Sequence, residues 1–165
     1  MDDSTASPRA GVSVDGFAEF YRACRTEMVR ALVLAVGDRE LGREAADEAF
    51  TRAMERWADV AEYANPKGWV YRVGLNWARS RQRRRRFESP GLAAEPSYRH
   101  RIPEPELLEA VDELPLSYRA VVVARFFLDW SIEDTAAALG VPEGTVKTRQ
   151  HRALKRLRKE LEVRP

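Results

Sequence analysis

Five side chains in the middle of the chain recur at steps of 3, 4, 3 and 4 residues: Trp69, Arg72, Asn76, Arg79 and Arg83. Residues at these steps share one face of an α-helix. The indole can stack on a base, the amide can pair with a base edge, and the guanidinium groups can bind phosphates. This face is therefore suited to binding a single nucleic-acid strand.

The same predicted helix also has an apolar face, formed by Val70, Val73 and Trp77. We expect that face to pack into the core, which leaves Trp69 available for a surface role. The alternative is that Trp69 is itself a core residue. The sequence leaves both interpretations open.

A second group of basic residues follows a helix-turn-helix pattern near the end of the chain. Ser131 with Asp134 three residues later resembles a capping box, and Gly140 can end the short helix with a positive φ. Ala136 is small where two helices would cross, and a longer helix is expected to begin at positions 142–145. The wedge between the helices would be filled by Leu139, Val141 and Val146.

The longer helix of this motif separates apolar from basic side chains. Its inward face is predicted to hold Val146, Ala153, Leu157 and Leu161. Its outward face carries donors suited to base edges and phosphates, namely Lys147, Thr148, His151, Arg152 and Lys155. A solvated, charged helix is the alternative, but the Ala-x-x-Leu-Gly-Val spacing before it favours DNA binding. Thr135 stands where the motif more usually has Ile, so one expected core residue is missing.

Charge is unevenly distributed along the 165 residues, although the net charge is only +2. Residues 106–140 carry two basic and seven acidic residues, net −5, whereas residues 141–165 carry eight basic and three acidic residues, net +5. Another basic block, Arg79 to Arg86, has six arginines in eight positions. Two basic blocks separated by acidic surface indicate two contacts with a polyanion.

Other classes of protein find little support. No apolar run approaches the roughly 20 residues of a membrane span, and the acidic N-terminus does not resemble a signal peptide. We therefore expect a cytoplasmic protein with no membrane contact of its own. Cys24 is the single cysteine and is predicted to be a buried thiol, and His100 and His151 lack partners at ligand spacing. No metal, cofactor or catalytic residue is expected.

Helices account for all the elements that must position these residues. Apolar residues at steps of three and four predict a first helix from Phe17 to Leu32, which Gly37-Asp38 breaks. A second helix is expected over residues 42–60. Its inward side chains are predicted to be Ala46, Ala49, Phe50, Ala53, Met54 and Trp57.

Capping signals mark the starts of later helices. Asn65 as N-cap and Pro66 at the first helical position start the helix that carries the arginine run. Further along, Pro115 interrupts an apolar pattern, and Ser117 is predicted to cap the next helix.

These signals predict an all-α protein of two small helical domains joined by a flexible linker, the second domain containing the helix-turn-helix. Residues 1–14 are expected to form a disordered tail, and residues 15–86 the first domain. Residues 87–105 contain four prolines without periodicity, which is typical of a linker. Residues 106–162 would form the second domain.

The second of these halves resembles a known family. Residues 114–161, which begin LPLSYRAVVVARFF, are similar to the C-terminal, −35-reading domain of the extracytoplasmic-function (ECF) sigma factors of bacterial RNA polymerase. The segment GTVKTRQHRA at residues 144–153 is the most specific part. The resemblance implies that the −35 element is contacted by Lys147, Thr148, Arg149, His151, Arg152 and Lys155.

The first half is similar to the core-binding and −10-reading segment of the same family. The family pattern has an acid-rich helix ending in Phe, a loop, and then Trp-x-x-Arg-x-x-x-Asn leading into a basic run. The resemblance implies that the −10 element is read by Trp69, Arg72, Asn76, Arg79 and Arg83. It implies that the loop at residues 57–68 holds a base flipped out of that element. It also implies that the clamp coiled coil of the largest polymerase subunit binds Glu44, Asp47, Glu48, Phe50 and Arg52.

The chain departs from the family pattern at three positions. Family members usually have Asp and Gln where this chain has Glu44 and Asp47, and Asp where it has Ser80. Acidic character on the polymerase-facing helix is nevertheless retained. The alternative for that acidic cluster is an ordinary solvated helix face.

The resemblance implies a sigma factor that binds core polymerase and promoter DNA, promotes promoter melting and has no catalytic activity of its own. An anti-sigma factor is a further expected partner. A free-standing transcription regulator is the first rival, but the βα pattern of a receiver domain is missing from the first half. An enzyme is the second rival, and no nucleophile set, phosphate loop or paired carboxylate supports it.

Overall fold

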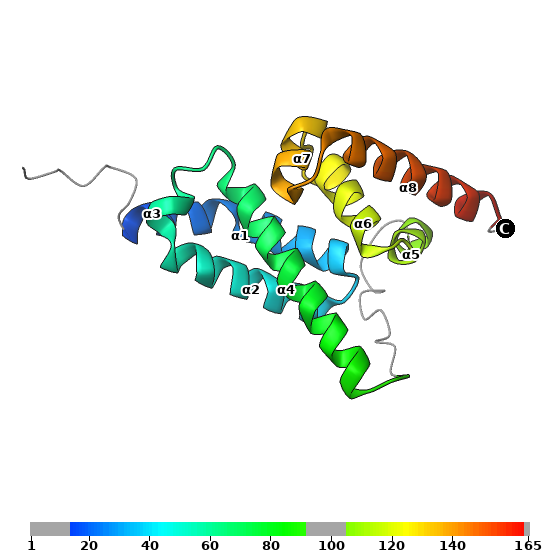
Figure 1. The fold of residues 1–165 in the computed structure, drawn as a ribbon, viewed down its shortest axis with the longest axis horizontal. Coiled ribbons are helices and arrows are strands. Elements are labelled where there is room, and N and C mark those ends of the chain that lie inside the picture. Colours follow the sequence, from blue (N-terminus) through cyan, green and yellow to red (C-terminus); the bar gives the residue numbers. More distant parts are fainter. Residues whose placement is uncertain (1–13, 92–104, 164–165) are drawn as a thin grey trace, which may run out of the picture.

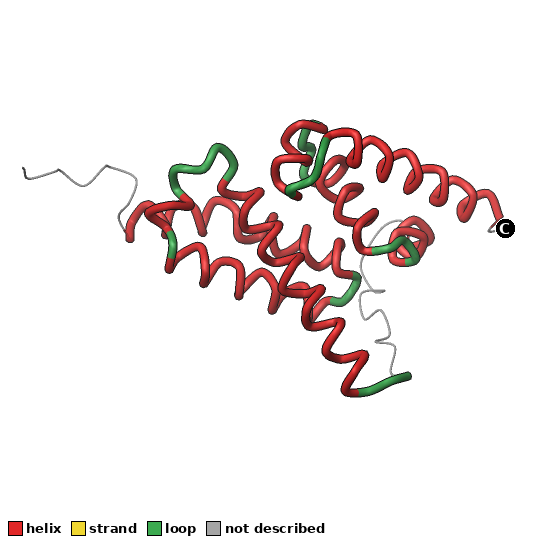
Figure 2. Tube along the Cα trace, viewed as in Figure 1, coloured by secondary structure: helices red, strands yellow, loops and turns green. Residues whose placement is uncertain are grey.

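The computed structural model describes residues 14–91 and 105–163, and every element in those ranges is helical (Figure 1, Figure 2). The first half holds α1 (Val14–Val36), α2 (Arg39–Glu55), α3 (Trp57–Val60) and α4 (Pro66–Glu88). The second half holds α5 (Pro105–Asp112), α6 (Leu116–Val122), the π-helical turn η1 (Val123–Phe127), α7 (Ile132–Leu139) and α8 (Glu143–Val163). The all-α fold with a C-terminal helix-turn-helix is confirmed.

The first half is a packed set of three long helices, α1, α2 and α4 (Figure 1). The turn between α1 and α2 is tight because Gly37 has φ +74° and Asp38 caps α2, accepting a 2.9 Å hydrogen bond from the Leu41 N–H. The predicted break at Gly37-Asp38 is therefore confirmed. The largest fully buried side chains of this half include Met28, Leu32, Leu41, Val70 and Tyr71.

The second half begins differently from the prediction. Helix α6 starts at Leu116 with Pro115 at the N-cap, so Ser117 lies inside the helix and does not cap it. The reason is that Pro115 has an extended backbone (φ −54°, ψ 145°), and the chain turns helical at the next residue. The helix then widens at η1, where the Leu128 N–H donates to the Val123 carbonyl five residues earlier.

The two halves are not separate in space. One cluster of buried side chains includes Leu32 and Tyr71 from the first half with Ala120, Ala124 and Leu128 from the second. Helix α6 packs on α1, and α7 packs on α4. The two halves thus share a core.

Several residues predicted to be inward are more exposed than expected. Met54 is 55% exposed because Ala49, Phe50 and Ala53 complete the inward face of α2. Leu161 is 40% exposed because it lies one turn beyond Leu157, the last buried residue of α8.

The predicted domain boundaries shift slightly at the helix ends. Phe87 and Glu88 belong to α4, and Pro105 begins α5, so the predicted linker is shorter at both ends. The predicted tail and most of the linker lie outside the described residues, except that Val14 already belongs to α1.

Thr135 is a weak point in the helix-turn-helix, and its replacement generates a prediction. Its side chain is fully buried, and its hydroxyl has no hydrogen-bond partner among the described residues. Thr135→Val removes this unpaired group at almost constant volume, so we expect the free energy of unfolding to rise by about 1 kcal/mol. A thermal melt should show a midpoint higher by roughly 2–4 °C. The control is Thr26→Val at an exposed position of α1, which should change nothing. A lower midpoint for Thr135→Val would contradict the assignment.

Candidate nucleic-acid interface

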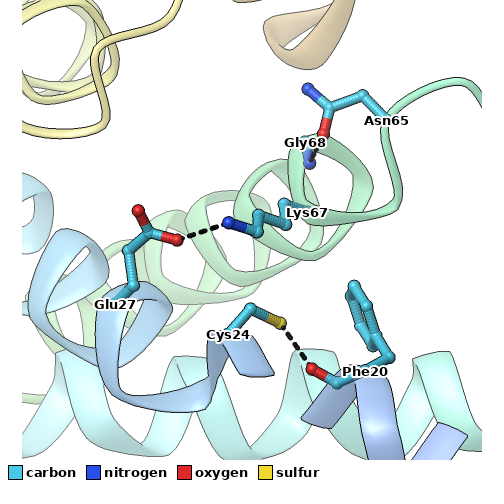
Figure 3. A network of polar contacts seen from close by, with 6 residues as sticks. All are labelled: Phe20, Cys24, Glu27, Asn65, Lys67 and Gly68. Carbon is cyan, nitrogen blue, oxygen red and sulfur yellow. Dashed lines mark hydrogen bonds and ion pairs between the residues drawn. The ribbon is translucent and has the colours of Figure 1, made fainter. Parts of the chain in front are cut away.

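The N-terminus of α4 is capped by its own segment and joined to α1 by one ion pair (Figure 3). Asn65 caps α4 by accepting a 2.9 Å hydrogen bond from the Gly68 N–H, and Pro66 takes the first helical position, as the sequence predicts. Lys67 Nζ donates to Glu27 Oε2 on α1 at 2.7 Å. These contacts set the position of the helix that carries Trp69.

Cys24 lies below this junction, on α1, and its thiol donates to the Phe20 carbonyl (Figure 3). The side chain is 1% exposed, which confirms the expected buried thiol. Burial raises the pKa of Cys24 to about 11, so the group stays neutral at physiological pH.

Helix α4 has one buried and one open face. The buried residues are Gly68, Val70, Tyr71, Gly74, Leu75 and Ala78, whereas Val73 and Trp77, predicted as core, are only half-buried at the edge of this face. The structure places Asn76, Arg79 and Arg83 on the opposite face, where they are exposed. They continue the stripe that begins with Trp69 and Arg72.

Trp69 takes an intermediate position between the two interpretations that the sequence left open. It is half-buried, packs against the core cluster and lies with its ring centroid 6.5 Å from that of Tyr63. Arg72 is also half-buried. Trp69 therefore has one packed side and one side open for stacking.

Two adjoining clefts run beside the open face of α4. The larger, of about 690 Å³, is lined by Trp69, Arg72 and Asn76 of α4, by Arg52 and Glu55 near the end of α2, and by Arg56, which follows that helix. The turn of the helix-turn-helix contributes Leu139 and Gly140 to the wall of this cleft. The smaller, of about 330 Å³, is lined by Arg52, Asn76, Trp77, Ser80, Arg81 and Arg84. Both are basic grooves suited to an anionic strand.

Sequence reasoning missed three of these arginines. Arg81 and Arg84 belong to the arginine run but not to the chosen stripe, and Arg56 lies between α2 and α3. The spacing of four residues between Arg52 and Arg56 was the available signal, because it puts both on one side of the helix expected over residues 42–60.

The helix-turn-helix has the predicted local geometry. Ser131 caps α7 by accepting a 3.0 Å hydrogen bond from the Asp134 N–H, and Gly140 ends it with φ +66°. On α8, Val146, Ala153 and Leu157 are buried. The predicted contact residues are exposed except Arg149, which is half-buried: Lys147, Thr148, Arg149, His151, Arg152 and Lys155. The motif thus presents a basic helix face to solvent.

The acidic cluster lies on the outer side of α2. Glu44 and Asp47 are exposed, and Glu48 accepts a 2.8 Å hydrogen bond from Arg52 Nε. Phe50 is different, since it is 3% exposed and packs its ring against those of Phe20 and Tyr21. Phe50 holds the helix in place and is not available on the surface.

Comparison with known proteins bears directly on this pair of basic faces. Residues 105–157 match the family described as Sigma-70, region 4. The RNA polymerase sigma-E factor of Streptomyces antibioticus is 33% identical over 154 residues, covering 90% of this chain and 86% of that protein. The ECF RNA polymerase sigma factor SigX of Bacillus subtilis is 27% identical over 164 residues, covering 89% and 84%. The chain belongs to the ECF sigma factors of RNA polymerase.

Two solved structures have the same fold. The sigma factor RpoE from Bartonella quintana, in complex with the anti-sigma factor NepR, matches with a TM-score of 0.77 at 21% identity, covering 92% of this chain and 100% of that one. CnrH in complex with the cytosolic domain of CnrY matches with a TM-score of 0.64 at 20% identity, covering 93% and 92%. In residues 14–91 and 105–163 of this sigma factor, no helix is long and apolar enough to cross a membrane.

The half-buried position of Trp69 generates a prediction about stability. Trp69→Ala removes a large side chain with only one packed side. We therefore expect the free energy of unfolding to fall by about 1–2 kcal/mol, less than the 3–5 kcal/mol lost when a fully buried aromatic residue is replaced. Asn76→Ala, at an exposed position of the same stripe, should stay within about 0.5 kcal/mol. Urea denaturation of both variants measures the difference. Equal losses would place Trp69 outside the core, and a loss of about 4 kcal/mol would make it a full core residue.

Proposed function

We propose that this ECF sigma factor divides promoter recognition between its two basic faces. Helix α8 reads the −35 element as duplex, and the open face of α4 captures the −10 element as a melted strand. The observation that carries this proposal is the exposure of two basic helix faces on different halves, each backed by a buried apolar stripe.

The chemistry of each face suits a different form of DNA. On α4, Trp69 offers a ring for stacking, Asn76 an amide for base edges, and the grooves beside them several guanidinium groups for phosphates. On α8, Arg152 and Lys147 are exposed on a regular helix that fits the width of a major groove. Tyr63 lies in the loop before α4, and Trp69 lies in the first turn of that helix. We assign to these two rings the contact with the base that leaves the stack when the promoter DNA opens.

The outer face of α2 is our candidate for binding core polymerase. Glu44, Asp47 and Glu48 present carboxylates there, with Arg52 alongside, and a basic or mixed-charge partner helix would complement them. Phe50 supports this face from below. The partner we assign is the clamp coiled coil of the largest subunit.

The polymerase supplies the chemistry in this proposal, and the sigma factor has no catalytic group of its own. Its place of action is the cytoplasm, where the polymerase works. RpoE and CnrH were each solved with a bound protein, NepR and the cytosolic domain of CnrY. By analogy we propose that an anti-sigma factor binds this chain.

Runoff transcription with purified core polymerase on genomic templates tests the function as a whole.

Within that assay, Asn76→Ala should abolish runoff from duplex promoters but retain it on a template whose −10 region is artificially melted, because only the opening step needs the amide. Size-exclusion chromatography checks that the variant still binds core. Full activity of Asn76→Ala on duplex promoters would show that strand capture uses another face. Tight, specific binding to DNA without core would favour the free-standing regulator.

Two residues of α8 should affect −35 binding differently. If Arg152 contacts a base edge, Arg152→Ala costs about 1–3 kcal/mol and relaxes preference at one base pair. If Lys147 contacts phosphate, Lys147→Ala weakens binding to all promoters and lowers the salt slope by about one. Competition binding by holoenzyme, with matched and mismatched −35 elements over a salt series, measures both effects. Equal losses on both elements for Arg152→Ala would remove its base-reading role.

A further inference from the structure

The larger cleft beside α4 contains side chains that binding of a DNA strand does not explain. Its volume of about 690 Å³ falls within the range of small-molecule sites, roughly 300–1,000 Å³. Glu55 and Val73 line it and have no part in the proposed capture of the strand. A carboxylate is unfavourable in a groove for a polyanion, because it repels phosphate. The cleft therefore calls for a ligand that also uses Glu55.

Arg72 supplies a cation without a partner. It is half-buried, and within residues 14–91 and 105–163 its side chain makes no ion pair or hydrogen bond. Its Nη1 lies against the turn of the helix-turn-helix, where a Cβ on Gly140 would come within 2.9 Å. A partly desolvated charge is costly unless it is paired. An anion in the cleft would provide that pair.

Two more guanidinium groups line the same cleft with donors to spare. Arg52 Nε donates to Glu48 at 2.8 Å, and no other contact of its guanidinium occurs in the described part of the chain. Arg56 lies 3.7 Å from Asp59, with both side chains more than half exposed. Guanidinium forks bind phosphate oxygens in pairs. Three of them in one cleft suit a polyphosphate better than the single phosphate of each DNA nucleotide.

The rest of the lining suits a single base. Trp69 has one ring face open for stacking, and Val73 and Leu139 add apolar surface. The Asn76 amide carries both a donor and an acceptor for a base edge. Leu139 and Gly140 bound the cleft on one side, which favours a short ligand over a long polymer.

Glu55 distinguishes a ribonucleotide from a deoxyribonucleotide. Its carboxylate is exposed and forms no ion pair among the described residues, although Arg56 follows it directly in the chain. A carboxylate accepts hydrogen bonds from the hydroxyl groups of a ribose, as in many dinucleotide sites. DNA lacks the 2′-hydroxyl. The full set of side chains thus fits a ribonucleoside polyphosphate better than it fits a DNA strand.

We propose that this cleft binds a free ribonucleoside triphosphate. The base stacks on Trp69, and the ribose hydroxyls donate to Glu55. The phosphates are bound by Arg52, Arg56 and Arg72. The proposal rests on the function assigned above, because the nucleotide occupies the cleft assigned to the −10 strand and competes with that strand. Promoter opening then responds to the concentration of the nucleotides that polymerase consumes.

Isothermal titration calorimetry of the full-length chain tests the site. The four common ribonucleoside triphosphates are titrated first, and the tightest is compared with its monophosphate, its 2′-deoxy form and inorganic triphosphate. The monophosphate and inorganic triphosphate should each bind at least about tenfold more weakly, because each lacks charge-assisted or stacking contacts. The deoxy form should bind about three- to tenfold more weakly, for one lost hydrogen bond.

Two variants locate the ligand in the cleft. Arg72→Gln should weaken triphosphate binding about tenfold, as expected for one lost charged contact. Glu55→Gln, at an exposed position that leaves the fold intact, should make the ribo and deoxy forms bind more nearly alike. The controls are Arg43→Gln and Glu40→Gln, exposed on the same helix but outside the lining, and both should bind like the parent chain. Circular dichroism verifies the helices of each variant.

Several results would overturn the nucleotide site. They are no binding at about 1 mM of any of the four triphosphates, equal binding of inorganic triphosphate, and an unchanged ribose preference in Glu55→Gln. If Arg72→Gln unfolds, Glu55→Gln alone decides.

Competition with the strand is measured in the same titration. Added single-stranded oligothymidylate should weaken the apparent affinity for the nucleotide, and no weakening at low salt would overturn the competition. Runoff transcription by the parent chain is measured in parallel. Nucleotide binding without runoff would refute the proposed function and leave the site intact, whereas runoff without nucleotide binding would refute the site alone.

Discussion

Close packing of α1, α2 and α4 is the constraint on which the rest of the structure depends. A Cβ on Gly42 of α2 would lie 2.5 Å from the Val33 Cα of α1, and one on Gly74 of α4 would lie 2.7 Å from the Leu32 side chain. Fully buried Ala45, Ala46 and Ala49 keep the remaining contacts equally close. Because α4 rests on both neighbours, only one side of it remains open. That side carries the indole, the amide and the guanidinium groups, and the clefts beside it follow from the same packing.

Local signals in the sequence were sufficient to predict most of the helix ends and the exposed faces of α4 and α8. The N-cap Asn65 followed by Pro66, the pair Ser131 and Asp134, and Gly140 act within a few residues, so each could be read without knowledge of the fold. The exposed faces of α4 and α8 were equally predictable, because in a regular helix the spacing of residues along the sequence determines the direction of their side chains. The candidate faces for DNA were therefore predictable, and the structure places their residues on the expected helices.

Contacts between distant segments were not predictable in the same way. Periodicity shows that a face is apolar but not which surface covers it, so neither Tyr71 nor Trp130 could be assigned to the junction of the halves. No local signal marks Arg119 as buried, because only the position of α1 makes its burial favourable. Met54 and Leu161 fail for a related reason: an apolar residue at the end of a stripe is buried only if the neighbouring helix extends that far.

The last turns of α4 combine helix formation with electrostatic strain. Four pairs of arginines stand three or four positions apart there: Arg79 and Arg83, Arg81 and Arg84, Arg81 and Arg85, and Arg83 and Arg86. Such like-charge pairs oppose the helix by about 0.2–0.5 kcal/mol each, and one ion pair, from Arg85 to Asp38 at 3.6 Å, offsets part of this. Phosphates along a strand would neutralise the same repulsion. Helix formation in these turns and binding of the DNA strand are therefore linked equilibria, and each bound phosphate also stabilises the helix. Added salt has two opposite effects: it screens the arginine repulsion and so favours the helix, and it competes with the strand for the groove.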